Sequence, residues 1–241
     1  MMLSKIKLEN VLFLDIETVP QYQNFESVPE NFQNLWEKKS EYFRTEEQNA
    51  GDVYARAGIY AEFGKIVCIS VGLINFKNTN KYLRLKSFYG DDEKNLLEEF
   101  GEMLSKLAQK KDIILCAHNG KEFDYPYIAR RCLINGLKLP NILDIAGKKP
   151  WEVRHLDTLE LWKFGDYKNY TSLNLLVAVF DLPSPKDDID GSQVGDIYWN
   201  ENDIKRITKY CEKDVVAVVQ LFLKYRIEDI ISDENIESVT Y

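Results

Sequence analysis

The chain has 241 residues, of which 45% are hydrophobic and 29% charged, and its net charge at pH 7 is −8. This composition is typical of a globular protein with a sizeable core, and no apolar run reaches the roughly 20 residues needed to cross a bilayer. The negative charge argues against broad binding of duplex nucleic acid, which needs a basic surface, but it permits binding of a few nucleotides at one end. Because no export signal is recognisable, we expect a cytoplasmic protein that does not associate with membranes.

The first strand and helix patterns occupy residues 11–90. The apolar run Val11 to Asp15 predicts a short buried strand that ends in carboxylates. Residues 21–60 are polar and rich in aromatic side chains, and we expect a helical insertion there, with a helix around 31–43. Two further segments, 65–73 and 81–87, are rich in β-branched and aromatic residues and predict strands.

The middle of the chain alternates helix and strand. Apolar residues at three- and four-residue spacing predict a helix over 92–109. A buried strand is expected over 113–117, followed by a helix over 124–135 that Gly136 ends.

The last third of the chain predicts a short strand at 155–157 and a helix over 172–180. Residues 184–196 are rich in serine, proline, glycine and aspartate, which is typical of a loop. A final helix is expected over 201–225. Strands with helices on both sides of them predict a single α/β layer structure.

The first segment that carries chemistry is FLDIETVP, with Asp15 and Glu17 at the end of the apolar strand. Residues two apart in a strand point to the same face, so both carboxylates aim at one site. Hard divalent cations such as Mg²⁺ prefer oxygen ligands of this kind. The alternative is a solvated strand end, where this spacing is also common.

The second segment is HNGKEFDYPY, which contains Asp124. An aspartate just before a helix is a good N-cap, and Pro126 is tolerated in the first helical turn. Capping and metal binding are compatible, because one carboxylate oxygen can accept a backbone N–H while the other faces a cation.

The third segment is YCEKD in the last helix. Tyr210 and Asp214 are four residues apart and lie on the same helical face. They flank the predicted core stripe, which consists of Ile204, Ile207, Cys211, Val215, Val218 and Phe222. The alternative is a tyrosine at the edge of the core with an exposed aspartate.

In this order the three segments resemble the motifs of the DEDD superfamily of 3′→5′ exonucleases, and the tyrosine of the third resembles the DEDDy subgroup. Residues 61–72, 172–183 and 188–199 resemble stand-alone exonucleases related to the proofreading domain of family B DNA polymerases. The resemblance implies an RNase H-like (DnaQ-like) fold, with a mixed central β-sheet flanked by helices, as a single exonuclease domain over residues 1–241.

The same resemblance implies two divalent metal ions, Mg²⁺ or Mn²⁺, and release of 5′-mononucleotides from the 3′ end of single-stranded nucleic acid. Asp15 and Asp214 would bind the ion that activates water, and Asp15 would also bind the second ion. Glu17 would bind the first ion near the terminal ribose, and Asp124 would act largely through water. Tyr210 would orient the attacking water, because a phenol is a poor base at neutral pH.

Further candidates have structural alternatives. Thr18 and Asn119 are candidates for substrate contact or site support, although Asn119 also suits a turn, and Phe123 suits either a place beneath the site or the core. Arg130 and Arg131 follow the second motif and are candidates for phosphate contacts, with a solvated helix face as the alternative.

Two other groups of residues also have a structural alternative. The spacing of Asp157 and Glu160 suits a capping box, which makes Asp157 structural. The insertion offers four aromatic residues either as a stacking platform for terminal bases or as a small core: Tyr22, Trp36, Tyr42 and Phe43.

The four cysteines are scattered without a CxxC pair, which favours reduced buried thiols over a zinc cluster: Cys68, Cys116, Cys132 and Cys211. The likeness to polymerase proofreading domains favours DNA over RNA as the substrate. An exoribonuclease that trims RNA 3′ ends, a non-catalytic nucleic-acid-binding module and a mononucleotide phosphatase remain the alternatives.

Overall fold

The computed structural model describes residues 2–166, 168, 170–183 and 189–240. In that part of the chain, six strands form one sheet in the order β5-β4-β1-β2-β3-β6. The strands are β1 (Val11–Pro20), β2 (Gly64–Lys77), β3 (Asn80–Tyr89), β4 (Ile114–Ala117), β5 (Leu156–Asp157) and β6 (Ile236–Ser238). β1, β2 and β3 form an antiparallel meander, whereas β4 pairs parallel to β1 and β5 parallel to β4. This is the predicted mixed RNase H-like sheet.

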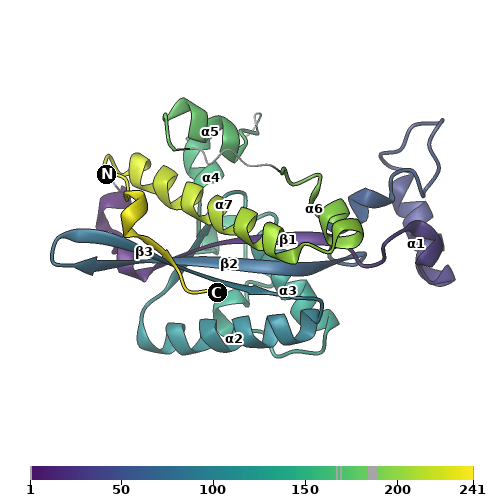
Figure 1. Ribbon diagram of the computed structural model, residues 1–241, viewed down its shortest axis with the longest axis horizontal. Helices are drawn as coiled ribbons and strands as arrows, with labels where there is room; N and C mark the ends of the chain where they lie inside the picture. Colours follow the sequence, from purple (N-terminus) through teal and green to yellow (C-terminus); the bar gives the residue numbers. More distant parts are fainter. Residues whose placement is uncertain (1, 167, 169, 184–188, 241) are drawn as a thin grey trace.

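Helices cover both faces of the sheet (Figure 1). α2 (Glu93–Lys110) and α3 (Asp124–Ile134) lie on one face. α7 (Ile204–Tyr225) crosses the other face, with α4 (Thr158–Lys163) and α5 (Leu173–Val179) beside it. None of the described helices combines the length and the apolar character needed to span a membrane.

The alternation of side chains along β1 divides the core between these two faces. Leu12, Leu14 and Ile16 belong to the cluster that packs under α2 and α3. Val11 and Phe13 belong to the cluster under α7, where the ring of Phe13 meets that of Phe222. Asp15 and Glu17 continue the second set and therefore face α7.

Local signals explain where the helices begin and end. Asp92 accepts the backbone N–H of Asn95 at 3.0 Å, so α2 begins at residue 93. α3 ends before Gly136, as predicted, and this glycine has a left-handed φ of +69°. Ser172 caps α5 in the same way as Asp92 caps α2.

Two sequence predictions need correction. β1 does not end at Asp15 but continues to Pro20, because residues up to Pro20 pair with β2. The predicted loop 184–196 is wrong at its end, since Val194–Asp196 form α6 and Ile197–Glu201 a π-helical turn. These turns form because their apolar side chains pack against α7. Residues 184–188 lie outside the described part of the chain.

Two elements have no counterpart in the prediction, α4 and the short edge strand β6. Both are only a few residues long, so periodicity gives little signal for them.

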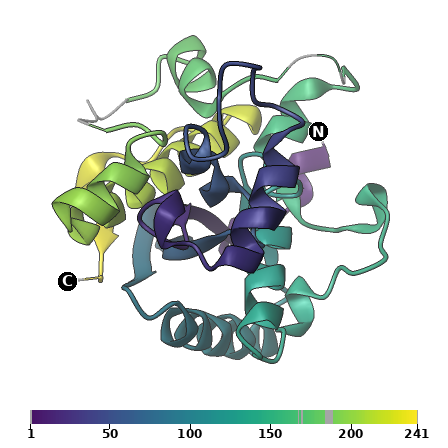
Figure 2. The same ribbon diagram turned by 90° about the vertical axis from the view of Figure 1, so that its right-hand side faces the viewer.

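Residues 21–60 contain the expected helix, α1 (Glu30–Ser40), which lies at one end of the molecule (Figure 1) and faces the viewer in Figure 2. The segment has a small core of its own around Trp36, which is fully buried and lies 5.8 Å from Phe43 between ring centroids. Tyr22 is partly buried against the same cluster, whereas Tyr42 is 85% exposed. Trp36 is thus a core residue and is not available as a stacking platform. The boundaries of the insertion and the single-domain assignment stay predictions.

Candidate active site

The centre of β1 provides the first two carboxylates. Asp15 is paired with Ser70 of β2 and Glu17 with Cys68, and the register then shifts so that Thr18 faces Ile66. This β-bulge leaves Val67 as the extra residue on β2, and Val67 and Cys68 both pack in the cluster on the α7 side. Asp15 and Glu17 therefore lie inside a continuous strand, not at its end, and both face the N-terminal half of α7.

α7 approaches β1 and β2 closely at this point. A Cβ on Gly72 would lie 2.9 Å from Val215, so a larger residue would push the helix away from the sheet. Cys211 is completely buried, and its thiol lies 3.4 Å from the backbone oxygen of Asp15 and 3.4 Å from the carboxylate oxygen Oδ2. Asp214 lies one turn along the helix from Tyr210 and is partly exposed.

Asp124 reaches the site from a third element. It is the first residue of α3, preceded by Phe123, so it begins the helix and is not its N-cap. β1 pairs with β4 only over residues 11–13. After residue 13, β1 no longer pairs with β4, and the buried carboxylate of Asp124 accepts the backbone N–H of Ile16. The same carboxylate also accepts the backbone N–H of Asp124 itself. The prediction of an N-cap is therefore wrong, although the carboxylate does accept backbone N–H groups, and its role in metal binding stays a prediction.

The carboxylates are close enough to influence one another. Burial, followed by the charges of Asp214, Glu17 and Asp124, raises the pKa of Asp15 well above its usual value. The pKa of Glu17 is raised by burial and by the same neighbouring charges from Asp214 and Asp124. Burial also raises the pKa of Asp124 to about 7. The fold brings all four predicted carboxylates into one acidic group.

This group suits divalent cations. Among the described residues, no lysine or arginine forms a salt bridge with Asp15, Glu17 or Asp124. Ligand atoms of Asp15, Glu17 and Cys211 lie within 4.8 Å of one another. Buried carboxylates without a partner cation repel one another, and hard cations such as Mg²⁺ favour oxygen ligands. The donor set therefore fits metal ions.

Tyr210 completes the group. Its hydroxyl donates a hydrogen bond to Asp214, and burial together with the charges of Asp214, Glu17 and Asp15 raises its pKa far above the ordinary value for tyrosine. The phenol therefore stays protonated at neutral pH, and it is suited to orienting a ligand and unsuited to accepting a proton.

The three candidates for substrate contact have structural partners. The hydroxyl of Thr18 bonds Tyr127, whose own hydroxyl donates to the carbonyl of Gly58 at 2.7 Å. Asn119 has a left-handed φ of +62°, which fits the turn alternative. Phe123 is partly buried, with its ring 5.3 Å from that of Tyr127. These contacts support the site, and direct contact of the three side chains with substrate stays a prediction.

Asp157 is structural, as expected. Its carboxylate accepts backbone N–H groups from four residues, two in the loop after β4 and two at the start of α4: Asn119, Lys121, Leu159 and Glu160. This arrangement fixes the loop that leads to Asp124. Both the phosphate contact and its alternative, a solvated helix face, are wrong for Arg131, which is buried against Glu93, whereas Arg130 is exposed.

One residue of the site escaped the sequence-based prediction. Cys211 was assigned to the apolar stripe of α7, and it does pack there, but its thiol also donates to Asp15. Its position between Tyr210 and Asp214 was the only available signal. All four cysteines are buried and free, as predicted.

The raised pKa values predict how stability depends on pH. In the metal-free protein the folded state holds protons on Asp15, Glu17 and Asp124 more tightly than the unfolded state does. The free energy of unfolding should therefore fall as pH rises from about 4 to about 7, where Asp124 titrates. Because a bound divalent cation offsets the repulsion, Mg²⁺ or Mn²⁺ should raise the melting temperature more at high pH than at low pH. Thermal melts in EDTA and in Mg²⁺ across this range measure both effects, and a metal-free melting temperature that rises with pH would contradict the prediction.

Residues 59–239 match a protein family described as a predicted 3′-5′ exonuclease related to the exonuclease domain of PolB. The match includes Asp124, Tyr210 and Asp214, and it begins after Asp15 and Glu17.

Proposed function

The chain belongs to the family of predicted 3′-5′ exonucleases related to the exonuclease domain of PolB, and we propose that it removes 5′-mononucleotides from the 3′ end of single-stranded DNA. The observation that carries the proposal is the group of four carboxylates from β1, α3 and α7, two of which, Glu17 and Asp124, are buried without a lysine or arginine partner among the described residues. Such a group is unfavourable unless cations bind it.

Asp15, Glu17, Asp124 and Asp214 would hold two divalent ions, Mg²⁺ or Mn²⁺. Such ions, when bound, supply an activated water and neutralise charge on the leaving oxygen. The protein's own contribution is to fix the carboxylates in place and to exclude bulk water. The Tyr210 hydroxyl, which donates to Asp214, would orient the nucleophile, as the resemblance to the DEDDy subgroup implies.

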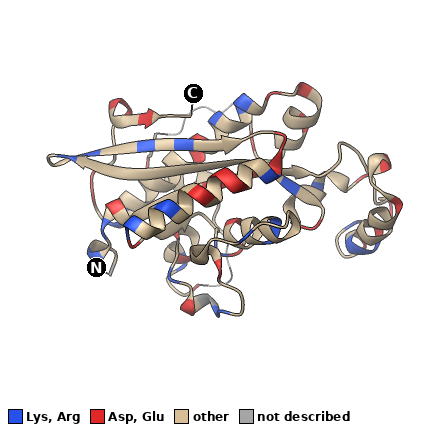
Figure 3. Ribbon diagram, turned by 90° about the horizontal axis from the view of Figure 1, so that it is seen from below, with Lys and Arg blue, Asp and Glu red and all other residues tan. Residues whose placement is uncertain are grey.

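Two observations support single-stranded DNA as the proposed substrate. The family is related to the exonuclease domain of a DNA polymerase, which favours deoxyribose. The net charge is −8, and the side of the molecule that carries α2 shows both basic and acidic residues in the described chain (Figure 3). A surface of this kind suits contact with a few nucleotides at an end better than contact with a long duplex.

The decisive experiment incubates the purified protein and Mg²⁺ or Mn²⁺ with single-stranded DNA and RNA of the same sequence, both labelled at the 5′ end. We expect a ladder of 3′-shortened products on DNA. Asp214→Asn should remove the ladder, and Asp233→Asn, a change at an exposed aspartate on a 3₁₀ turn, is the matched control. A ladder on RNA alone would replace the proposed substrate with RNA. No ladder on either would reject the enzyme and favour a binding module.

Tyr210→Phe should slow DNA cleavage by about tenfold to a hundredfold, which is less than the loss of a carboxylate causes. The substitution removes the hydroxyl that bonds Asp214 but keeps the ring, which packs beside Ile207 and Cys211. Steady-state kinetics should place the loss in kcat. Tyr225→Phe is the control, because the buried Tyr225 hydroxyl has no hydrogen-bond partner among the described atoms. Equal losses in the two variants would rule out a specific role for Tyr210.

A further inference from the structure

A thiol lies directly behind the carboxylate of Asp15. Cys211 is completely buried, and its S–H donates to the backbone oxygen and to Oδ2 of Asp15, each at 3.4 Å. Asp15 is repelled by Asp214, Glu17 and Asp124. In the metal-free protein this hydrogen bond therefore opposes the tendency of Asp15 to turn away from its neighbours.

The thiol of Cys211 is the first member of a row of buried polar side chains that contact one another across β2 and β3. The Cys211 sulfur also interacts with the thiol of Cys68, which lies opposite Glu17 on β2. The Cys68 sulfur lies 3.6 Å from the hydroxyl of Ser70, and that hydroxyl lies 2.7 Å from the hydroxyl of Ser87 on β3. The three residues on β2 and β3 are buried in the sheet, where apolar side chains would pack without any need for partners.

The row ends on α7, one residue after Cys211. Ser87 donates to the carboxylate of Glu212 at 2.9 Å, and Ser238 and Thr240 donate to the same oxygen at 2.9 and 2.5 Å. Every member thus has a partner, as buried polar groups require. A buried network of this kind limits the orientations of its members, and the member nearest the acidic group is Cys211.

We propose that Cys211 is a positioning residue that holds Asp15 in the orientation needed for metal binding, an inference that rests on the proposed function. The S–H donates to Oδ2, so Oδ1 and the remaining lone pairs of Asp15 would be available to a cation. Loss of a hydrogen bond to a metal ligand typically weakens metal affinity about 10- to 100-fold. Because a thiol is a weak donor, the effect of Cys211 should lie at the lower end of that range.

The test compares Mn²⁺ binding to the full chain by isothermal titration calorimetry, with thermal melts in EDTA as a measure of folding. Cys211→Ala should weaken Mn²⁺ binding about tenfold. Cys211→Ser keeps a donor and should restore the wild-type affinity. Cys132→Ala is the matched control, because Cys132 is equally buried but belongs to the core between the sheet and α3. If Cys211→Ala fails to fold, Cys211→Val removes the donor while it fills the space.

Wild-type affinity in Cys211→Ala or Cys211→Val would overturn the proposal, and so would an equal loss in Cys132→Ala, which would indicate a general packing effect. Failure of Cys211→Ser to restore binding would also count against a hydrogen-bonding role. If these variants bind Mn²⁺ normally and degrade DNA, only the inference about Cys211 fails. If the wild-type protein binds no Mn²⁺, the proposed function fails and the inference fails with it.

Discussion

Asp15→Asn should lower the exonuclease rate by about a thousandfold or more, and it should also make the metal-free protein more stable. Asparagine has nearly the same shape as aspartate, so the packing against Cys211 changes little. It lacks the charge that binds cations and that repels Asp214, Glu17 and Asp124. Removal of the charge then explains both the loss of activity and the gain of stability. A general disruption of the fold would lower activity and stability together.

Single-turnover cleavage of labelled DNA measures the rate, and thermal melts in EDTA measure stability. Asp157→Asn is the informative contrast for the melts, because the Asp157 carboxylate accepts four backbone N–H groups and its loss should lower the melting temperature. Full activity in Asp15→Asn would show that the carboxylate group is not the active site. A lower metal-free melting temperature would show that repulsion within the group is weak.

The parts of this site that the sequence could predict depend on local periodicity. A strand places residues two apart on one face, which aligns Asp15 with Glu17, and a helix places residues four apart on one face, which aligns Tyr210 with Asp214. The order of strands and helices along the chain was also sufficient to predict an α/β layer structure, whereas the mixed sheet was implied by the family resemblance.

The parts that the sequence could not predict depend on pairing between distant segments. β1 extends beyond Asp15 because residues 16–20 find partners on β2, and the bulge opposite Glu17 exists only in that pairing. The contact between Cys211 and Asp15 joins residues 196 positions apart. No local pattern distinguishes a thiol that fills the core from one that also donates to a carboxylate.

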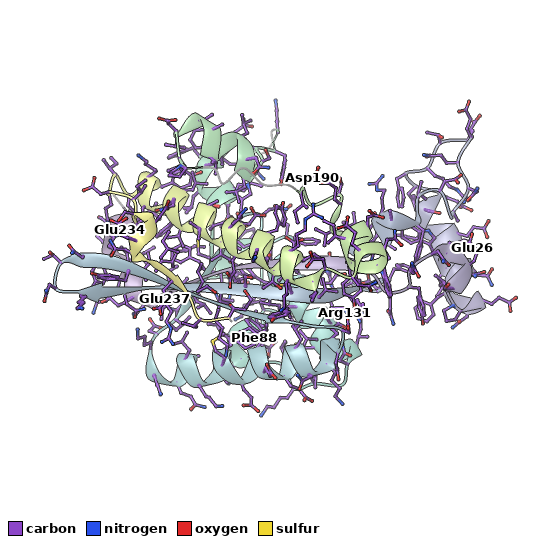
Figure 4. The ribbon with its side chains drawn as sticks, in the orientation of Figure 1. Glu26, Phe88, Arg131, Asp190, Glu234 and Glu237 are labelled. Atoms are coloured by element: carbon purple, nitrogen blue, oxygen red, sulfur yellow. The ribbon has the colours of Figure 1, made fainter. Side chains whose placement is uncertain are left out.

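Arg131 is the clearest example of this limit. Next to the second motif, an arginine suits either a phosphate contact or solvent, yet its side chain is only 4% exposed. It lies between the sheet and the α2 layer (Figure 4). Its partner is Glu93, 38 residues away, which it meets through two hydrogen bonds of 2.8 and 2.5 Å. The remaining donor NH1 reaches the carbonyl of Ala61 at 2.8 Å.

Breaking this buried pair should produce the largest loss of stability available from one substitution at a charged residue. Arg131→Met would leave Glu93 charged and buried, and Glu93→Gln would leave the guanidinium of Arg131 without its counterion, so each should lower the free energy of unfolding by about 3–5 kcal/mol. Glu93 also accepts the backbone N–H of Ile66 at 2.7 Å, so its loss further loosens α2 from β2. Urea unfolding of the single variants measures these losses.

The double variant Glu93→Gln/Arg131→Met distinguishes an uncompensated charge from a lost attraction. If the penalty comes mainly from leaving one charge buried and unpaired, the double variant should be more stable than either single variant, because no unpaired charge then stays buried. Lys106→Met is the control, because the Lys106–Glu102 pair on α2 is exposed and its removal should change stability little. Strict additivity in the cycle would mean that Glu93 and Arg131 do not stabilise each other, which their burial and their two hydrogen bonds argue against.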